Sequence, residues 1–122
     1  MDGSIFFSAD TKGNVLVVTL LRSVGSIAEN DARDEWADLL EQADDEGIQH
    51  VLLDFTALHY FGSVMLEWMV TLWKKLRERE GKLAICNVSS VGREILHTAK
   101  FDTLWDIHES RDEAFSSLGD AA

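Results

Sequence analysis

Proline is absent from the 122-residue chain, and cysteine occurs only once. Without proline, no segment has the composition of a stiff linker between domains. The single cysteine, Cys86, excludes an internal disulfide and fits a reducing compartment. The first residues lack the basic and apolar segments of a secretory signal, and the longest apolar runs stop short of the roughly 18 residues that span a membrane. We therefore expect one cytoplasmic domain, at about residues 4–118.

Basic side chains are also scarce. The chain has 11 Lys and Arg against 22 Asp and Glu, which gives a formal net charge of −11. Nucleic acids and anionic membranes are bound by clustered Lys and Arg, so neither is an expected partner. Hydrophobic residues make up 46% of the chain, enough for a packed core. The composition favours a globular domain whose partners are proteins.

Strand and helix patterns alternate along the chain. Apolar and β-branched runs predict strands at about residues 5–8, 15–21, 51–55, 82–86 and 105–108. Capping residues and helical periodicity predict helices at about residues 26–46, 63–80, 89–100 and from 110 onward. The order ββαβαβαβα predicts an α/β fold with a mainly parallel sheet and an antiparallel N-terminal hairpin.

Side chains that could hold a metal or a cofactor are dispersed. The four histidines are far apart in the sequence, and none lies one helical turn from another ligand, so we expect no metal site. Gly62 and Gly92 are isolated, and no glycine-rich phosphate loop is present. No cofactor is expected.

Catalytic arrangements are not evident either. Asp54 ends a predicted strand, as does the phospho-accepting aspartate of response-regulator receivers, but the second carboxylate and the lysine that such chemistry needs are missing. A small hydrolase or ligand-binding domain could use Asp54, Ser63 and Asn87 at the strand ends. No base is visibly paired with Ser63, however, so we do not expect an enzyme.

The most informative stretch runs from residue 50 to residue 66, where a buried strand leads into a helix that begins near Ser63. A hydroxyl at this position lies beside unpaired backbone N–H groups and the positive end of the helix dipole. Ser63 can therefore cap the helix or carry a phosphate. Along this helix, Met65, Met69, Leu72 and Leu76 form the expected core stripe. Trp68 is expected either to be partly exposed beside Ser63 or to pack under a neighbouring loop.

Charge is distributed unevenly between two predicted helices. Between Glu29 and Glu46 the chain has nine carboxylates and one arginine, whereas the helix after Ser63 ends in a basic segment, residues 74–82. Both patterns are ordinary for solvated helix faces, and cations near a helix C-terminus interact favourably with the dipole. Patches of opposite sign can also guide docking, which leaves a weak homodimer open.

With its elements in this order, the chain resembles the STAS domain family of anti-sigma factor antagonists over nearly its whole length. The local anchor is the strand Val51-Leu-Leu-Asp54-Phe55, the link that follows and the apolar helix. The family's pattern at the link is an acidic residue, two small residues and a glycine, and a partner kinase phosphorylates the second small residue. Here the stretch is Phe61-Gly62-Ser63-Val64. Ser63 occupies the acceptor position, while Phe61, Gly62 and Val64 depart from the pattern.

The resemblance implies a regulatory switch without chemistry of its own. The unmodified domain would bind an ATP-binding anti-sigma factor kinase, and phosphorylation of Ser63 by that kinase would break the complex. The alternative is a STAS adaptor that is not phosphorylated, for example a subunit bound to the ATPase of an ABC-type lipid transport system. The departures at Phe61 and Val64 favour this alternative, as does the apolar Trp68. The expected partner-binding residues are Asp54, Phe61, Gly62, Ser63, Val64 and Trp68.

Overall fold

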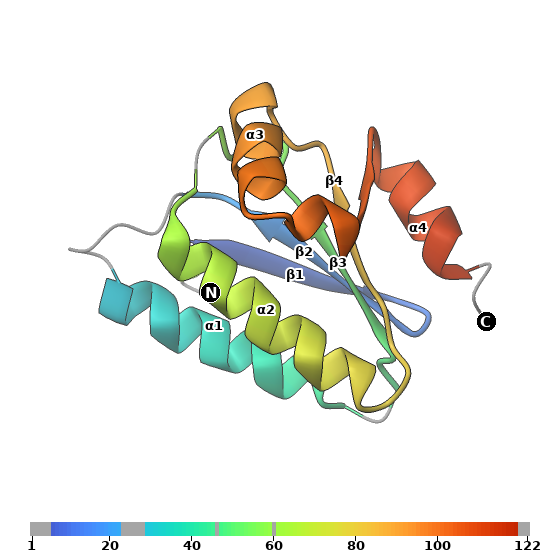
Figure 1. The fold of residues 1–122 in the computed structure, drawn as a ribbon. Helices are drawn as coiled ribbons and strands as arrows, with labels where there is room; N and C mark the ends of the chain where they lie inside the picture. The colour runs from blue at the N-terminus through green and yellow to red at the C-terminus, as the bar shows by residue number, and fades with distance from the viewer. Residues whose placement is uncertain (1–5, 23–28, 46, 60, 120–122) are drawn as a thin grey trace.

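The computed structural model describes residues 6–22, 29–45, 47–59 and 61–119, and it has one mixed sheet flanked by helices (Figure 1). The strands are β1 (Phe7–Lys12), β2 (Val15–Leu20), β3 (His50–Asp54), β4 (Leu83–Cys86) and β5 (Asp106–His108). The helices are α1 (Glu29–Ala43), α2 (Ser63–Arg77), α3 (Ser90–Thr98) and α4 (Arg111–Gly119), with a short 3-10 turn, η1 (Phe101–Thr103). The α/β fold and the order ββαβαβαβα are confirmed. The expected cap at Ser26 lies outside the described residues.

The strands are added to the sheet in the order in which they occur, β1-β2-β3-β4-β5. β1 is antiparallel to β2, and the remaining neighbours are parallel. Right-handed crossovers that all advance in one direction place their helices on the same face of a sheet. α1, α2 and α3 accordingly cover one face, and α4 covers the other (Figure 1).

The N-terminal hairpin differs from the expected one in the extent of its first strand. The strand predicted at residues 5–8 continues to Lys12, because the whole of β1 pairs with β2 in register from Phe7 opposite Leu20 to Lys12 opposite Val15. Pairing with an apolar partner thus overrides the polar composition of residues 8–12. The turn between the two strands contains Gly13, whose φ of +59° is a conformation that glycine adopts without strain.

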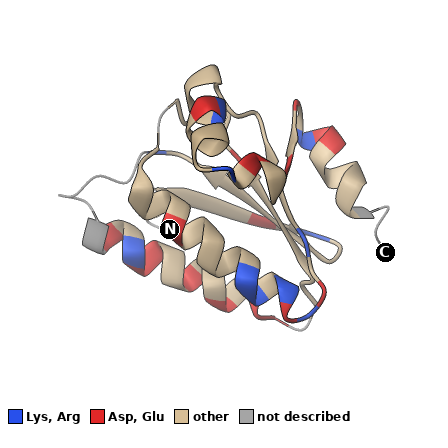
Figure 2. Ribbon diagram, viewed as in Figure 1, with Lys and Arg blue, Asp and Glu red and all other residues tan. Residues whose placement is uncertain are grey.

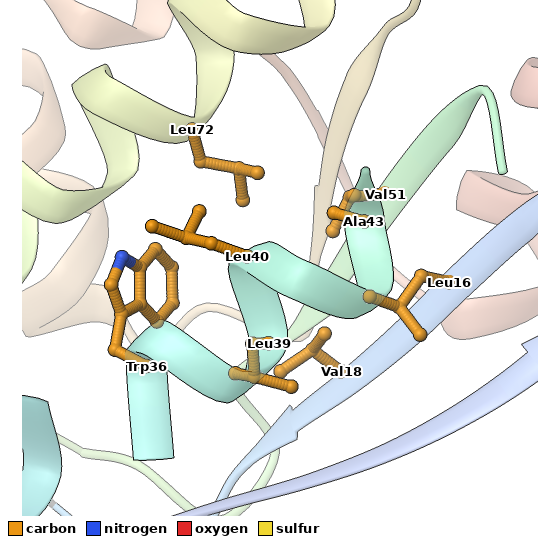
Figure 3. Close-up of a pocket in the computed structure, with 8 residues that line it drawn as sticks. All are labelled: Leu16, Val18, Trp36, Leu39, Leu40, Ala43, Val51 and Leu72. Atoms are coloured by element: carbon orange, nitrogen blue, oxygen red, sulfur yellow. The ribbon is translucent and has the colours of Figure 1, made fainter. Parts of the chain in front are cut away.

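The main core lies between the sheet and the three helices on its first face. The predicted stripe of α2 is buried there in full: Met65, Met69, Leu72 and Leu76. A small apolar cavity remains between α1, α2 and the sheet (Figure 3). Its volume is about 10 Å³, at the lower limit of what one water molecule needs, and its lining is apolar. The cavity is too small for an organic ligand.

The second face of the sheet has a smaller core of its own. α4 contributes Ala114 and Leu118, which pack on apolar side chains from the three central strands. The sheet residues in this cluster are Val15, Val17, Leu52, Ala84 and Cys86. No helix within the described residues is long and apolar enough to cross a membrane.

The C-terminal ends of α1 and α2 are joined by charge. α1 has no basic residue in its last turn, so its carbonyl end has no cation of its own. Lys75 of α2 lies 3.3 Å from Asp44, Arg79 lies 3.6 Å from the same carboxylate, and Arg79 also donates to the carbonyl oxygen of Ala43. Figure 2 shows this basic end of α2 beside the acidic α1. Cations of one helix thus stabilise the terminus of another.

Candidate partner-binding site

The carboxyl ends of β2, β3 and β4 meet at one edge of the sheet, because these strands are parallel neighbours. Thr19 and Asp54 are paired residues near the ends of β2 and β3, and Asn87 directly follows β4. The link to α2 and the start of α3 leave from the same edge. This edge is where open α/β sheets usually bind ligands and partners.

Asp54 is the centre of a polar network at this edge, and only 3% of its surface is exposed. Its Oδ1 accepts hydrogen bonds from the backbone N–H of Thr56 at 2.9 Å, the Thr56 hydroxyl at 2.5 Å and Asn87 Nδ2 at 3.2 Å. Its Oδ2 accepts from Arg111 Nε at 2.9 Å. Arg111 Nη2 also donates to Thr19 Oγ1 at 2.8 Å. The network therefore joins two strands, two loops and the start of α4.

The carboxyl of Asp54 is held in its charged form. Burial alone would raise its pKa, but hydrogen bonds from Thr56, Asn87 and Arg111 outweigh burial and lower the pKa below its usual value. A buried carboxylate that is paired and fully hydrogen-bonded fixes its surroundings. Asp54 thus organises the edge from below and exposes little surface for a partner.

Arg111 was not among the expected site residues. It is the first residue of α4, where the positive end of the helix dipole disfavours a cation. An arginine at that position indicates an interaction that outweighs the dipole, and this is the one signal in the sequence that could have revealed it. The helix predicted from residue 110 onward is capped by the preceding residue, Ser110, whose Oγ accepts a hydrogen bond from the N–H of Glu113 at 3.1 Å.

Only part of the arrangement that the hydrolase alternative requires is present. The structure brings Asp54 and Asn87 together, but no hydrogen bond between Ser63 and either residue occurs among the described residues. Cys86 is fully buried, and burial together with the carboxylate of Asp54 raises the pKa of its thiol to about 12. Such a thiol is a poor nucleophile. Over the described ranges, no group of three or more His, Cys, Asp or Glu side chains is arranged to hold a metal ion.

Ser63 is the first residue of α2, and its side chain is exposed. The prediction that it could serve as the N-cap is wrong, because Gly62 occupies the cap position with extended backbone angles, φ −109° and ψ −167°. Gly62 makes no side-chain hydrogen bond to this helix, and the first turn of the helix has no acidic residue. The unpaired N–H groups and the dipole of α2 therefore have no negative group opposite them within the helix.

Phe61 precedes this junction and is buried, with 1% of its surface exposed. Its ring lies 5.0 Å from that of Phe55. Gly92 of α3 leaves room for it, since a Cβ on Gly92 would come within 2.9 Å of Phe61 Cε1. Ser89 Oγ, which caps α3, also donates to the carbonyl oxygen of His59 at 2.6 Å. The link before Ser63 is therefore fixed against the start of α3.

Trp68 is half-buried and packs within the domain. Its ring stacks on Trp36 of α1 at 5.6 Å with an interplanar angle of 21°, and lies 6.5 Å from Phe7 of β1. Trp68 is thus partly exposed, as the first expectation has it, and its packing is against α1 and β1, where the second expectation has a loop. Among the expected partner-binding residues, Ser63 is exposed and Gly62 and Val64 are half-exposed. Their contact with a partner stays a prediction.

The STAS domain model matches residues 7–114. The chain belongs to the STAS domain family. Its α/β fold also resembles the solved structure of an anti-sigma factor antagonist (STAS) domain protein from Planctomyces limnophilus, with a TM-score of 0.80 at 23% identity, covering 94% of this chain and 99% of the other.

Two further comparisons connect this STAS domain with anti-sigma factor antagonists. BtrV of Bordetella bronchiseptica, a candidate anti-sigma factor antagonist, is 29% identical over 82 residues, which are 67% of this chain and 70% of BtrV. The anti-sigma factor antagonist SpoIIAA, from Bacillus, matches in its unphosphorylated form with a TM-score of 0.73 at 14% identity, covering 92% of this chain and 95% of SpoIIAA. Its phosphorylated form matches with a TM-score of 0.66.

Proposed function

We propose that this STAS domain is an anti-sigma factor antagonist that binds a protein partner at the edge around Ser63, and that phosphorylation of Ser63 releases the partner. The observation that carries the proposal is the exposed hydroxyl at the first residue of α2, a helix whose cap residue makes no side-chain hydrogen bond and whose first turn has no acidic residue. The expected partner is a cytoplasmic, ATP-binding serine kinase that also acts as the anti-sigma factor. The domain itself is proposed to span residues 4–118 and to have no catalytic role.

Electrostatics explains how one phosphate would act in two ways. A phosphoserine adds about −1.5 to −2 charge at neutral pH. Within the domain, that charge is stabilised by the N–H groups and the dipole of α2. Across a close-packed interface, the same charge and its bound water must be accommodated by the partner, which costs binding energy. SpoIIAA has been solved both with and without phosphate, so a fold of this kind accommodates the modification.

The buried positions of two residues also bear on the constitutive adaptor. That alternative depends on apolar side chains beside Ser63 that would hold a permanent partner. Phe61 is buried against Phe55 and cannot form such a surface, while Trp68 is stacked on Trp36 and, like Val64, is only partly exposed. The switch at Ser63 is the better supported of the two functions.

The test compares baits in a pull-down from native lysate, with intact mass measured on each recovered bait. The baits are the wild type, Ser63→Ala, Ser63→Asp and Ser90→Asp. Ser90 is a matched control, because it is also exposed and is the first residue of α3. We expect one added phosphate on part of the wild type and none on Ser63→Ala. A serine kinase should be recovered with every bait except Ser63→Asp. If the wild type instead carries no phosphate and all four baits recover the same partner, the domain is a constitutive adaptor.

A further inference from the structure

The outward face of α2 continues from Ser63 along the helix. Glu67, Thr71 and Lys74 are exposed on this face, opposite the buried stripe. Beside it lies an open groove whose floor is apolar. Its lining residues are Ser63, Leu66, Glu67, Val70, Thr71 and Phe101. A helix face that combines an apolar groove with charged edges is typical of surfaces that pack against another helix.

Glu67 and Lys74 are charged residues of opposite sign on this face. Neither forms an ion pair with any residue that the structure describes. The neighbouring cations are engaged: Lys75 and Arg79 pair with Asp44, and Arg77 lies 4.8 Å over the ring of Trp73. Glu67 and Lys74 are seven residues apart, two helical turns or about 10.5 Å along the axis.

This spacing is self-complementary in an antiparallel arrangement. The midpoint between Glu67 and Lys74 falls between Val70 and Thr71, and Val70 is half-buried at the edge of the groove. A two-fold axis through that point would bring Glu67 of each copy opposite Lys74 of the other. Val70 lies beside this axis and lines the groove, so the same axis would also bring the apolar grooves of the two copies together.

We propose that this face of α2 is a self-association surface, on which a second copy of the chain packs its α2 antiparallel to the first. Two symmetric Glu67–Lys74 pairs fix the register, and Leu66, Val70 and Phe101 supply the apolar contact. The net charge of −11 on each copy opposes association, so the dimer is weak. Since Ser63 lines the same groove, the dimer covers it, and self-association competes with a kinase for Ser63. This last consequence rests on the proposed function, whereas the dimer does not.

The test is sedimentation velocity on the purified full chain from about 1 to 500 µM at low salt, where charge pairs are least screened. The wild type should show a reversible monomer–dimer equilibrium. Lys74→Glu and Glu67→Lys should each weaken the dimer at least about tenfold, because two-fold symmetry makes each substitution act twice. The double variant, Glu67→Lys with Lys74→Glu, restores both pairs in reverse and should return to within about threefold of the wild type.

Lys82→Glu is the matched control, since it makes the same change of charge at an exposed position outside α2. It should weaken the dimer only slightly, through the added net charge. A wild type that stays monomeric to about 500 µM would overturn the proposal. A double variant whose dimer is no tighter than the dimers of the single variants would also overturn the proposal. The measurement involves no kinase, so its failure leaves the test at Ser63 intact, and the reverse also holds.

Discussion

Asp54 joins four parts of the chain through one side chain. It holds Thr56 in the loop toward α2, Asn87 before α3 and Arg111 of α4, and Arg111 in turn reaches Thr19 of β2. The loops that lead into α2 and α3 are thus held by a group that is itself almost fully buried. Loss of its charge should affect stability and the geometry of this edge together.

We expect Asp54→Asn to lower the free energy of unfolding by about 2–3 kcal/mol at pH 7, because Arg111 loses the carboxylate that it pairs with. Urea denaturation measures this. Because the pKa of Asp54 is lowered in the folded protein, the contribution of its charge is present above about pH 4 and is lost as pH falls through the lowered value. The difference from the wild type should therefore be constant above about pH 5 and shrink below pH 4. Asp106→Asn, at an exposed position of β5, should change the stability by less than about 0.5 kcal/mol.

Cys86 provides a probe of opening, since it is the one thiol of the chain. It is fully buried and its pKa is raised to about 12, so the reactive thiolate is scarce in the folded protein. We expect a thiol reagent such as DTNB to react at pH 8 at least about 100-fold more slowly with the native protein than with protein in denaturant. Fast reaction without denaturant would contradict the burial of Cys86.

At the scale of elements, α1 depends on α2 for its C-terminal stabilisation. We expect Arg79→Ala to lower the free energy of unfolding by about 1–2 kcal/mol, because the Ala43 carbonyl and Asp44 both lose a cationic donor. Lys74→Ala is the control, since Lys74 is exposed and has no ion pair with a described residue. Equal effects of the two substitutions in urea denaturation would show that Arg79 acts only through the overall charge.

The start of α3 and the link before Ser63 are coupled through Gly92. Alanine favours helices over glycine by about 1 kcal/mol, yet we expect Gly92→Ala to destabilise by about 1–3 kcal/mol, because the new methyl group would meet Val88 and Phe61. Phe61→Leu should recover part of this loss, since a smaller side chain relieves the contact. A double-mutant cycle measures the coupling, and purely additive effects would contradict direct contact.

The sequence was sufficient for the elements and their order, because the periodicity of apolar residues is local information. The core stripe of α2 and the strand formed by residues 15–20 followed from it directly. The candidate site was harder to predict from the sequence. Asp54 and Arg111 are 57 residues apart, and only the sheet and the packing of α4 bring them together. The shift of the cap from Ser63 to Gly62 depends on backbone angles that composition does not specify.

For the whole molecule, the net charge of −11 is a source of self-repulsion in the compact state. We expect the free energy of unfolding at pH 7 to rise by about 1 kcal/mol between roughly 20 and 500 mM NaCl, because screening relieves this repulsion more than it weakens the few exposed ion pairs. Urea denaturation at both salt concentrations tests this. Near the isoelectric point of about 4.6, the dependence on salt should disappear. A fall in stability with salt at pH 7 would show that favourable pairs dominate.

The placement of α4 alone on the second face of the sheet has a consequence for biosynthesis. α4 follows all five strands in the chain, so it leaves the ribosome after the sheet that it covers. Until then, the apolar side chains of β2, β3 and β4 on that face, including Val17 and Leu52, are not covered by any other helix that the structure describes. The nascent domain therefore passes through a stage at which one face is complete and the other is open to chaperones or to aggregation.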